Sequence, residues 1–221
     1  MTQYLLNFGR IESFDDEDYI VTSSNAHALD WIERWPHWGD GVYSNITCIY
    51  GEKLSGKSHL ARIWSRKSNA INLTKESLAD KTYVDSSCSS YVIEDVQTLV
   101  GHEVDLFNFF EHIIHSKKNL MLTADIVISR IPFNLPDLRS RLNSVFSIEI
   151  KRPDEEMIEQ ILLKYFSDKQ ISVSSAVIKY LVARVNFSYK DILESVEKLD
   201  KASLEAQKNI SIPFIKSILN F

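Results

Sequence analysis

The sequence predicts an α/β fold, in which a parallel sheet is sandwiched by helices, followed by a small all-α domain. Three observations lead to this prediction. Short apolar runs typical of strands alternate with helical patterns up to Ile150. A glycine-rich loop, Gly51–Ser58, joins one such run to a helical pattern. From Asp154 onward only helical patterns remain.

The elements of the first part follow from apolar spacing. The expected strands are short β-rich runs at Ile46–Tyr50, Ala70–Leu73, Tyr91–Ile93 and Asn119–Thr123. The expected helices carry apolar residues three or four positions apart and lie at Asn25–Arg34, Ser58–Lys67 and Leu106–Ser116. An apolar strand followed by a helix and another strand favours parallel pairing.

The second part contains four expected helices. Asp154 follows a proline and is a suitable N-cap for the first of them. Ser175–Val185 and Tyr189–Gln207 form the next two, and Ser211 caps the last, with Pro213 in its first turn. We therefore divide the chain into an N-terminal peptide at 1–12, an α/β domain at 13–152 and a helical domain at 153–221.

Composition indicates an ordinary globular protein. The net charge of −5 and the pI of about 5.7 lower the expectation of autonomous nucleic-acid binding, which usually needs a basic face. No apolar run approaches the roughly 20 residues of a membrane span, and no signal peptide is evident, so we expect a cytoplasmic protein. Cys48 and Cys88 show no metal spacing and are expected to be two core thiols.

The glycine-rich loop matches the pattern G-x-x-x-x-G-K-S at Gly51, Gly56, Lys57 and Ser58. Glycines let the backbone wrap tightly, so that successive N–H groups point at phosphate oxygens. The following helix would present its positive dipole end to the same anion. Lys57 would contact the β- and γ-phosphates, and the Ser58 hydroxyl would reach Mg²⁺. The sequence therefore predicts a nucleotide site.

Two further strands end in polar residues. Glu94 and Asp95 follow Tyr91–Ile93, where one carboxylate would act on the metal side and one would orient an attacking water. Thr123 or Asp125, at the end of the next strand, would sense the γ-phosphate or order that water. The alternatives are solvated acids at strand ends and a simple strand cap.

An arginine in the segment Leu138–Leu142 is a candidate arginine finger that acts on a neighbouring subunit's nucleotide. The segment contains two arginines, Arg139 and Arg141. The alternative is that the Arg-Ser-Arg sequence forms a solvated helix face.

Five segments together resemble the DnaA/Hda family of AAA+ proteins, and the Hda branch most closely. They read GEKLSGKSHL, YVIEDVQ, LTAD, LPDLRSRL and EKLDKASLEAQKNISIPFIKSIL. The resemblance covers roughly Phe14 to Phe221, and its last two segments are the most specific. It implies an AAA+ α/β domain followed by a small helical lid.

The resemblance also implies roles for individual positions. Asp95, Asp125 and Arg141 fall at catalytic positions, Arg141 acting in trans, and Ser58 and Glu94 fall at Mg²⁺ positions. The expected nucleotide contacts are Gly51, Lys53, Ser55, Gly56, Lys57, Ser58, His59, Tyr19, Ile20, Asn25 and Lys190.

Two departures from the family pattern bear on catalysis. Glu94 stands where the family usually has Asp, and Lys190 stands near an expected sensor arginine. Lysine lacks the planar fork of arginine, so the two differ at phosphate. We expect binding of ADP or ATP with Mg²⁺ but weak intrinsic hydrolysis, which leaves open whether the chain is itself an enzyme.

The N-terminal sequence Q-x-x-L-x-F, with Gln3, Leu6 and Phe8, looks like a peptide that docks into a pocket of the DNA polymerase sliding clamp. The alternative is that Leu5, Leu6 and Phe8 cover part of the core.

The function that the resemblance implies is regulation of chromosomal replication initiation. With the sliding clamp, the protein would promote hydrolysis of ATP bound to the DnaA AAA+ domain. The chain ends at Phe221 where DnaA continues into a helix-turn-helix, so we expect no direct sequence-specific DNA binding and no membrane contact. A homo-oligomer is possible. The alternatives are a DNA-associated ATPase resembling a helicase loader and a scaffold that needs no nucleotide.

Overall fold

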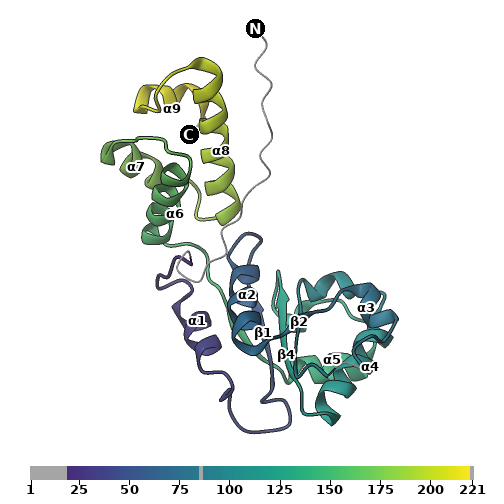
Figure 1. The fold of residues 1–221 in the computed structure, drawn as a ribbon. Helices are drawn as coiled ribbons and strands as arrows, with labels where there is room; N and C mark the ends of the chain where they lie inside the picture. The colour runs from purple at the N-terminus through teal and green to yellow at the C-terminus, as the bar shows by residue number, and fades with distance from the viewer. Residues whose placement is uncertain (1–18, 85–86, 220–221) are drawn as a thin grey trace.

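The computed structural model describes residues 19–84 and 87–219, and the predicted clamp peptide at 1–12 lies outside these residues. Figure 1 shows two parts: a sheet with its helices, and a separate group of helices joined to it after the last strand. This arrangement confirms the predicted fold class of an α/β domain with a small all-α lid.

The sheet has five parallel strands in the order β2-β3-β4-β1-β5. Their bounds are β1 Ile46–Tyr50, β2 Ile71–Asn72, β3 Ser90–Ile93, β4 Asn119–Ala124 and β5 Phe146–Glu149. Strand β5 was not among the expected strands, because it is a half-exposed edge strand that lacks the apolar run of a central strand. Since all strands are parallel, their carboxyl ends meet at one edge of the sheet.

Alternate side chains of the central strands enter two separate cores. Ile49, Val92 and Met121 pack on one face against α1 (Ala26–Glu33) and α2 (Lys57–Ser68). The neighbours of these residues along each strand point to the opposite core, as the two-residue period of a strand requires. The central sheet is therefore buried on both faces.

The opposite face is covered by α3 (Lys75–Ala79), α4 (Glu103–His115) and α5 (Pro136–Asn143). Short 3-10 turns, η2 (Val96–Leu99) and η3 (Ile128–Arg130), follow β3 and β4. Figure 1 shows α4 and α5 on the far side of the sheet from α1 and α2. The helices thus form the outer layers of a three-layer domain.

The lid consists of α6 (Glu155–Asp168), α7 (Ser175–Val182), α8 (Tyr189–Ala206) and α9 (Ile212–Ile218). These helices enclose a core of their own, which includes fully buried residues from α6 to α9. Each helix begins at a side-chain cap, as expected for Asp and Ser at that position. The four caps are Asp154, Ser174, Ser188 and Ser211.

The prediction of two core thiols is confirmed for Cys48, whereas Cys88 is only half-buried and packs against the edge of the same core. Cys48 is buried in β1, and burial raises the pKa of its thiol to about 12. Cys88 is half-buried in the loop before β3, where its Sγ lies 3.0 Å from the Ser90 carbonyl oxygen.

Helix α4 begins three residues before the predicted start, because Glu103 and Asp105 occupy its polar first turn. Within the described ranges, no helix is both long and apolar enough to cross a membrane.

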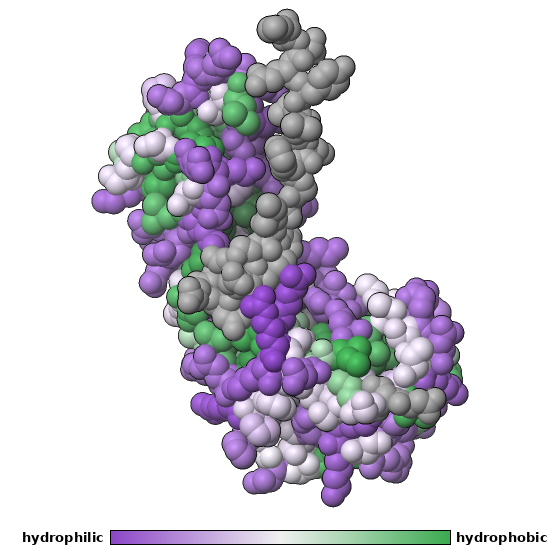
Figure 2. All heavy atoms as spheres, viewed as in Figure 1, coloured by the Kyte–Doolittle hydropathy of each residue, from purple (hydrophilic) through white to green (hydrophobic). Residues whose placement is uncertain are grey.

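The surface that Figure 2 shows is mostly hydrophilic on both parts, with hydrophobic residues in smaller patches. This distribution is typical of a globular protein, whose apolar residues gather in cores.

Asp154 stabilises the junction between the two parts. Its carboxylate accepts hydrogen bonds from the Met157 N–H at 2.7 Å and the Ser23 hydroxyl at 2.7 Å. Burial alone would raise the pKa of Asp154, but these hydrogen bonds outweigh burial and lower it.

We expect Asp154→Ala to reduce the free energy of unfolding in urea by about 1 kcal/mol at neutral pH, because the cap of α6 is lost.

Asp154→Asn, which keeps the cap, should lose less. Because the folded pKa is lowered, the advantage of wild type over Asp154→Ala is present above the ordinary carboxyl pKa of about 3.9 and disappears as pH falls through the folded value. An advantage that does not change with pH would contradict this account.

Candidate functional site

The glycine loop lies between β1 and α2 at the carboxyl edge of the sheet. A Cβ on Gly51 would lie 2.7 Å from the Ile150 carbonyl oxygen, so only glycine fits there. Gly56 has a φ of 95° and lies beneath the ring of Tyr19, so a side chain there would be both strained and crowded. Leu54 also adopts a positive φ of 68°, which is rare for a residue with a side chain. The backbone is thus folded into a tight loop.

Lys57 is the buried cation of the loop. Its Nζ donates to the carbonyl oxygens of Gly51 at 2.9 Å and Glu52 at 3.0 Å, and it lies 3.1 Å from Asp125 Oδ1. Only 7% of its side chain is exposed. A buried ammonium group needs such partners, because desolvation of an unpaired charge is costly. The predicted phosphate lysine and the predicted sensor acid are therefore in direct contact.

The ends of β3 and β4 are joined by a chain of hydrogen bonds. The Asp95 N–H donates to Thr123 Oγ1 at 2.9 Å, and Gln97 Nε2 donates to Asp95 Oδ1 at 3.2 Å. Gln97 Oε1 in turn accepts from the Asp125 N–H at 3.2 Å. Asp95 has a φ of 52°, in the left-handed region that Asp tolerates better than most residues. Sequence reasoning assigned no role to Gln97, although this residue ends the segment YVIEDVQ, two residues after the acidic pair.

The two residues predicted to bind Mg²⁺, Ser58 and Glu94, lie in different surroundings. Ser58 is exposed in the first turn of α2. Glu94 instead receives a hydrogen bond from Asn72 Nδ2 at 3.1 Å, which directs its carboxylate toward β2. In the described part of the chain, no group of three or more His, Cys, Asp or Glu residues could hold a metal ion. Mg²⁺ commonly uses one or two protein ligands together with substrate phosphates, so such a group is not required.

The segment before α1 covers one side of the loop. The ring of Tyr19 lies edge-on to the ring of His59, with 5.1 Å between centroids, and burial raises the pKa of Tyr19 above its usual range. Asn25 is 2% exposed, and its amide bonds the Thr22 N–H and the Ile20 carbonyl oxygen. Asn25 therefore shapes the turn that presents Tyr19 and Ile20.

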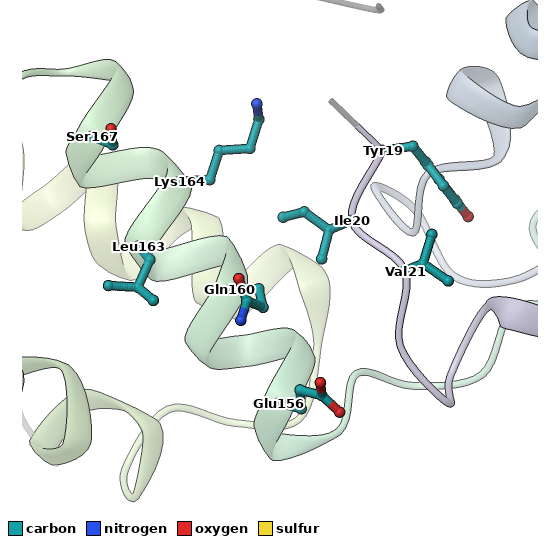
Figure 3. Close-up of a pocket in the computed structure, with 8 residues that line it drawn as sticks. All are labelled: Tyr19, Ile20, Val21, Glu156, Gln160, Leu163, Lys164 and Ser167. Atoms are coloured by element: carbon teal, nitrogen blue, oxygen red, sulfur yellow. The ribbon is translucent and has the colours of Figure 1, made fainter. Parts of the chain in front are cut away.

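A cavity of about 470 Å³ lies between this segment and α6. Figure 3 shows Ile20 extending toward α6, whereas Tyr19 extends away from it. The lid wall was missed by sequence reasoning, since its residues look like the exposed face of an amphipathic helix. That wall consists of Glu156, Gln160, Leu163, Lys164 and Ser167.

The lid also reaches the loop through α8. The Tyr189 N–H donates to Glu52 Oε1 at 2.8 Å, so the first turn of α8 touches the glycine loop. Lys190 follows directly and is mostly exposed, with its Nζ 3.6 Å from Glu194 Oε1. The predicted sensor lysine is thus the second residue of the helix that contacts the loop.

Arg141 lies on α5, whose partner helix α4 holds its side chain in place. Its Nη1 is 2.6 Å from Glu111 Oε1, and its guanidinium lies over the Phe107 ring, 5.1 Å from the centroid. About 29% of the side chain is exposed. Arg141 is thus half-buried, whereas Arg139 and Ser140 before it are exposed, as the alternative of a solvated helix face expects.

The loop suits a phosphate group. The Ser55 hydroxyl is buried in it with no hydrogen-bond partner among the described residues. The N-terminus of α2 has neither a side-chain cap nor an acidic residue in its first turn, so its positive end is not compensated there. A nucleoside phosphate would satisfy these groups and compete with Asp125 for Lys57.

Two further sets of predicted residues remain. Lys53, the last predicted contact in the loop, is exposed. The predicted clamp-binding residues Gln3, Leu6 and Phe8 lie outside the described residues.

Comparison with known proteins identifies relatives of both parts. The family model of the Hda lid domain matches residues 154–219. An uncharacterized protein of Haemophilus influenzae is 31% identical over 187 residues, which cover 78% of this chain and 80% of the relative.

Solved structures match the whole fold. Domain III of the replication initiation protein DnaA of Thermotoga maritima aligns with a TM-score of 0.75 and 17% identity, covering 94% of this chain and 96% of that one. AMPPCP-bound DnaA of Aquifex aeolicus aligns with a TM-score of 0.66 and 18% identity, covering 86% of this chain and 65% of that one.

Proposed function

The chain belongs to the DnaA/Hda-like AAA+ proteins, and on that premise we propose that it is a nucleotide-binding regulator of replication initiation. The observation that carries this proposal is the glycine loop with Lys57 buried inside it. The Aquifex aeolicus relative binds a nucleoside triphosphate analogue, which supports a nucleotide as the ligand.

The geometry supports a division of the ligand between two places. The phosphates would lie along the loop, where Lys57 and the Ser55 hydroxyl bind them and Ser58 is available to Mg²⁺. The base would enter the cavity between Ile20 and α6, where Leu163 offers apolar contact and Gln160 offers an amide. ADP and ATP share these features.

Weak intrinsic hydrolysis fits the same geometry. Glu94 is bonded to Asn72, so its longer side chain is drawn toward the sheet edge and away from β4. Asp125 is paired with Lys57 and would need to exchange this partner before it acts on a water. We propose that the nucleotide serves mainly as a conformational ligand.

The proposed reaction takes place on a partner. Arg141 would stabilise charge on ATP bound to the DnaA AAA+ domain, while the N-terminal peptide tethers the protein to the sliding clamp. Its position on α5, held by Phe107 and Glu111, orients the guanidinium before a partner arrives.

Lys57→Ala should weaken binding of both ADP and ATP with Mg²⁺ by at least about tenfold in calorimetry, because the phosphates lose their buried cation. Lys67→Ala is a matched control, since Lys67 lies at the other end of α2 and bonds the Glu33 carbonyl oxygen. If wild type binds neither nucleotide, the scaffold alternative holds instead.

Arg141→Ala should fold and bind ADP normally but lose stimulation of ATP hydrolysis on DnaA by about 10³-fold or more, because the finger that stabilises transition-state charge is removed. The readout is phosphate release from ATP-loaded DnaA with the clamp on DNA. Arg139→Ala tests a nearby exposed arginine of the same helix and should retain stimulation. Unchanged activity of Arg141→Ala would refute the role.

Combined Gln3→Ala and Phe8→Ala changes should abolish capture by immobilised sliding clamp, because they remove the polar and aromatic anchors of the peptide. Asn7→Ala, at a position that the motif leaves free, should bind as wild type does. Equal capture of all variants would place clamp binding elsewhere or nowhere.

A further inference from the structure

We propose that Glu52, inside the glycine loop, is a positioning residue that transmits nucleotide occupancy to the lid. This inference rests on the proposed nucleotide binding. Its basis is one contact across 137 residues of sequence: Glu52 Oε1 accepts the backbone N–H of Tyr189 at 2.8 Å.

The contact is informative because of its place in α8. Ser188 is the N-cap, so Tyr189 is the first residue of the helix, and its N–H has no acceptor within the helix. The Ser188 hydroxyl accepts a hydrogen bond from the Asp191 N–H and not from the Tyr189 N–H. The glycine loop therefore supplies a cap that the lid does not supply for itself, and the carboxylate also suits the positive end of α8.

Glu52 is connected to the phosphate position as directly as to the lid. Its own carbonyl oxygen accepts from Lys57 Nζ at 3.0 Å. When Lys57 turns to a phosphate, this bond is exchanged, and the Glu52 peptide is free to reorient. The side chain on the same residue would carry that change to Tyr189.

Tyr189 is anchored firmly enough to pass the change on. It is 3% exposed, and its hydroxyl lies 3.3 Å from the Lys151 carbonyl oxygen and 3.4 Å from Ser24 Oγ. Those residues belong to the junction between the sheet and the lid and to the segment before α1. The next residue is Lys190, so a shift of this first turn moves the proposed sensor lysine.

The experiment follows the Tyr189 amide by NMR hydrogen exchange, with and without ADP and Mg²⁺, and measures ADP affinity by calorimetry. In nucleotide-free protein, Glu52→Ala should accelerate exchange at Tyr189 by roughly fivefold to tenfold, because the amide loses its acceptor. ADP affinity should fall by about tenfold, a usual size for coupling between two sites. Glu52→Gln retains an acceptor and should recover most of both losses.

Tyr189→Phe separates the two anchors, since it removes the hydroxyl contacts and keeps the backbone N–H, which should stay protected. ADP should change exchange at Tyr189 in wild type and have no effect on it in Glu52→Ala. The proposal is overturned if Glu52→Ala matches wild type in exchange or in ADP affinity, or if ADP leaves wild-type exchange unchanged. If wild type binds no nucleotide, the proposed function fails, and the nucleotide-free comparison still decides whether Glu52 caps α8.

Discussion

The buried ammonium group of Lys57 is the interaction on which the rest of the site depends. It holds together the end of β1, the glycine loop and the end of β4, because its partners are Gly51, Glu52 and Asp125. A cation so nearly excluded from water would be destabilising without these partners. The parallel sheet brings the partners to one edge, and the tight approach of Gly51 to Ile150 fixes the loop against β5 and the lid junction.

The two parts of the molecule are joined by polar contacts of a few residues and not by a shared apolar core alone. Asp154 caps α6 and also bonds Ser23, while Tyr189 bonds both the junction and the glycine loop. Each part has its own buried cluster, and only a few lid residues, such as Met157 and Tyr189, belong to the core beside α2. Hydrogen bonds of this kind can be exchanged at little cost when a ligand offers alternatives.

Most helices and strands of the fold could be predicted from the sequence, because the spacing of apolar residues follows the period of a buried strand or an amphipathic helix. Strand β5 was not predicted, because an edge strand with half-exposed side chains lacks that apolar pattern. In the site, spacing predicted Lys57, Asp125 and Asp95 near one another, as parallel strand ends require. It could not predict Gln97 or Glu52, whose contacts depend on side-chain direction and on the position of a helix far along the chain.

The pairing of Arg141 with Glu111 has a consequence for how selective the proposed finger would be. Engagement of a partner's phosphate is then an exchange of one anion for another, and the Coulomb energy gained is reduced by that of the ion pair with Glu111 that is given up. Selectivity would come from geometry, because a triphosphate at the correct distance offers the planar guanidinium more acceptors than one carboxylate does. An anionic surface without that geometry would not displace Glu111 from Arg141.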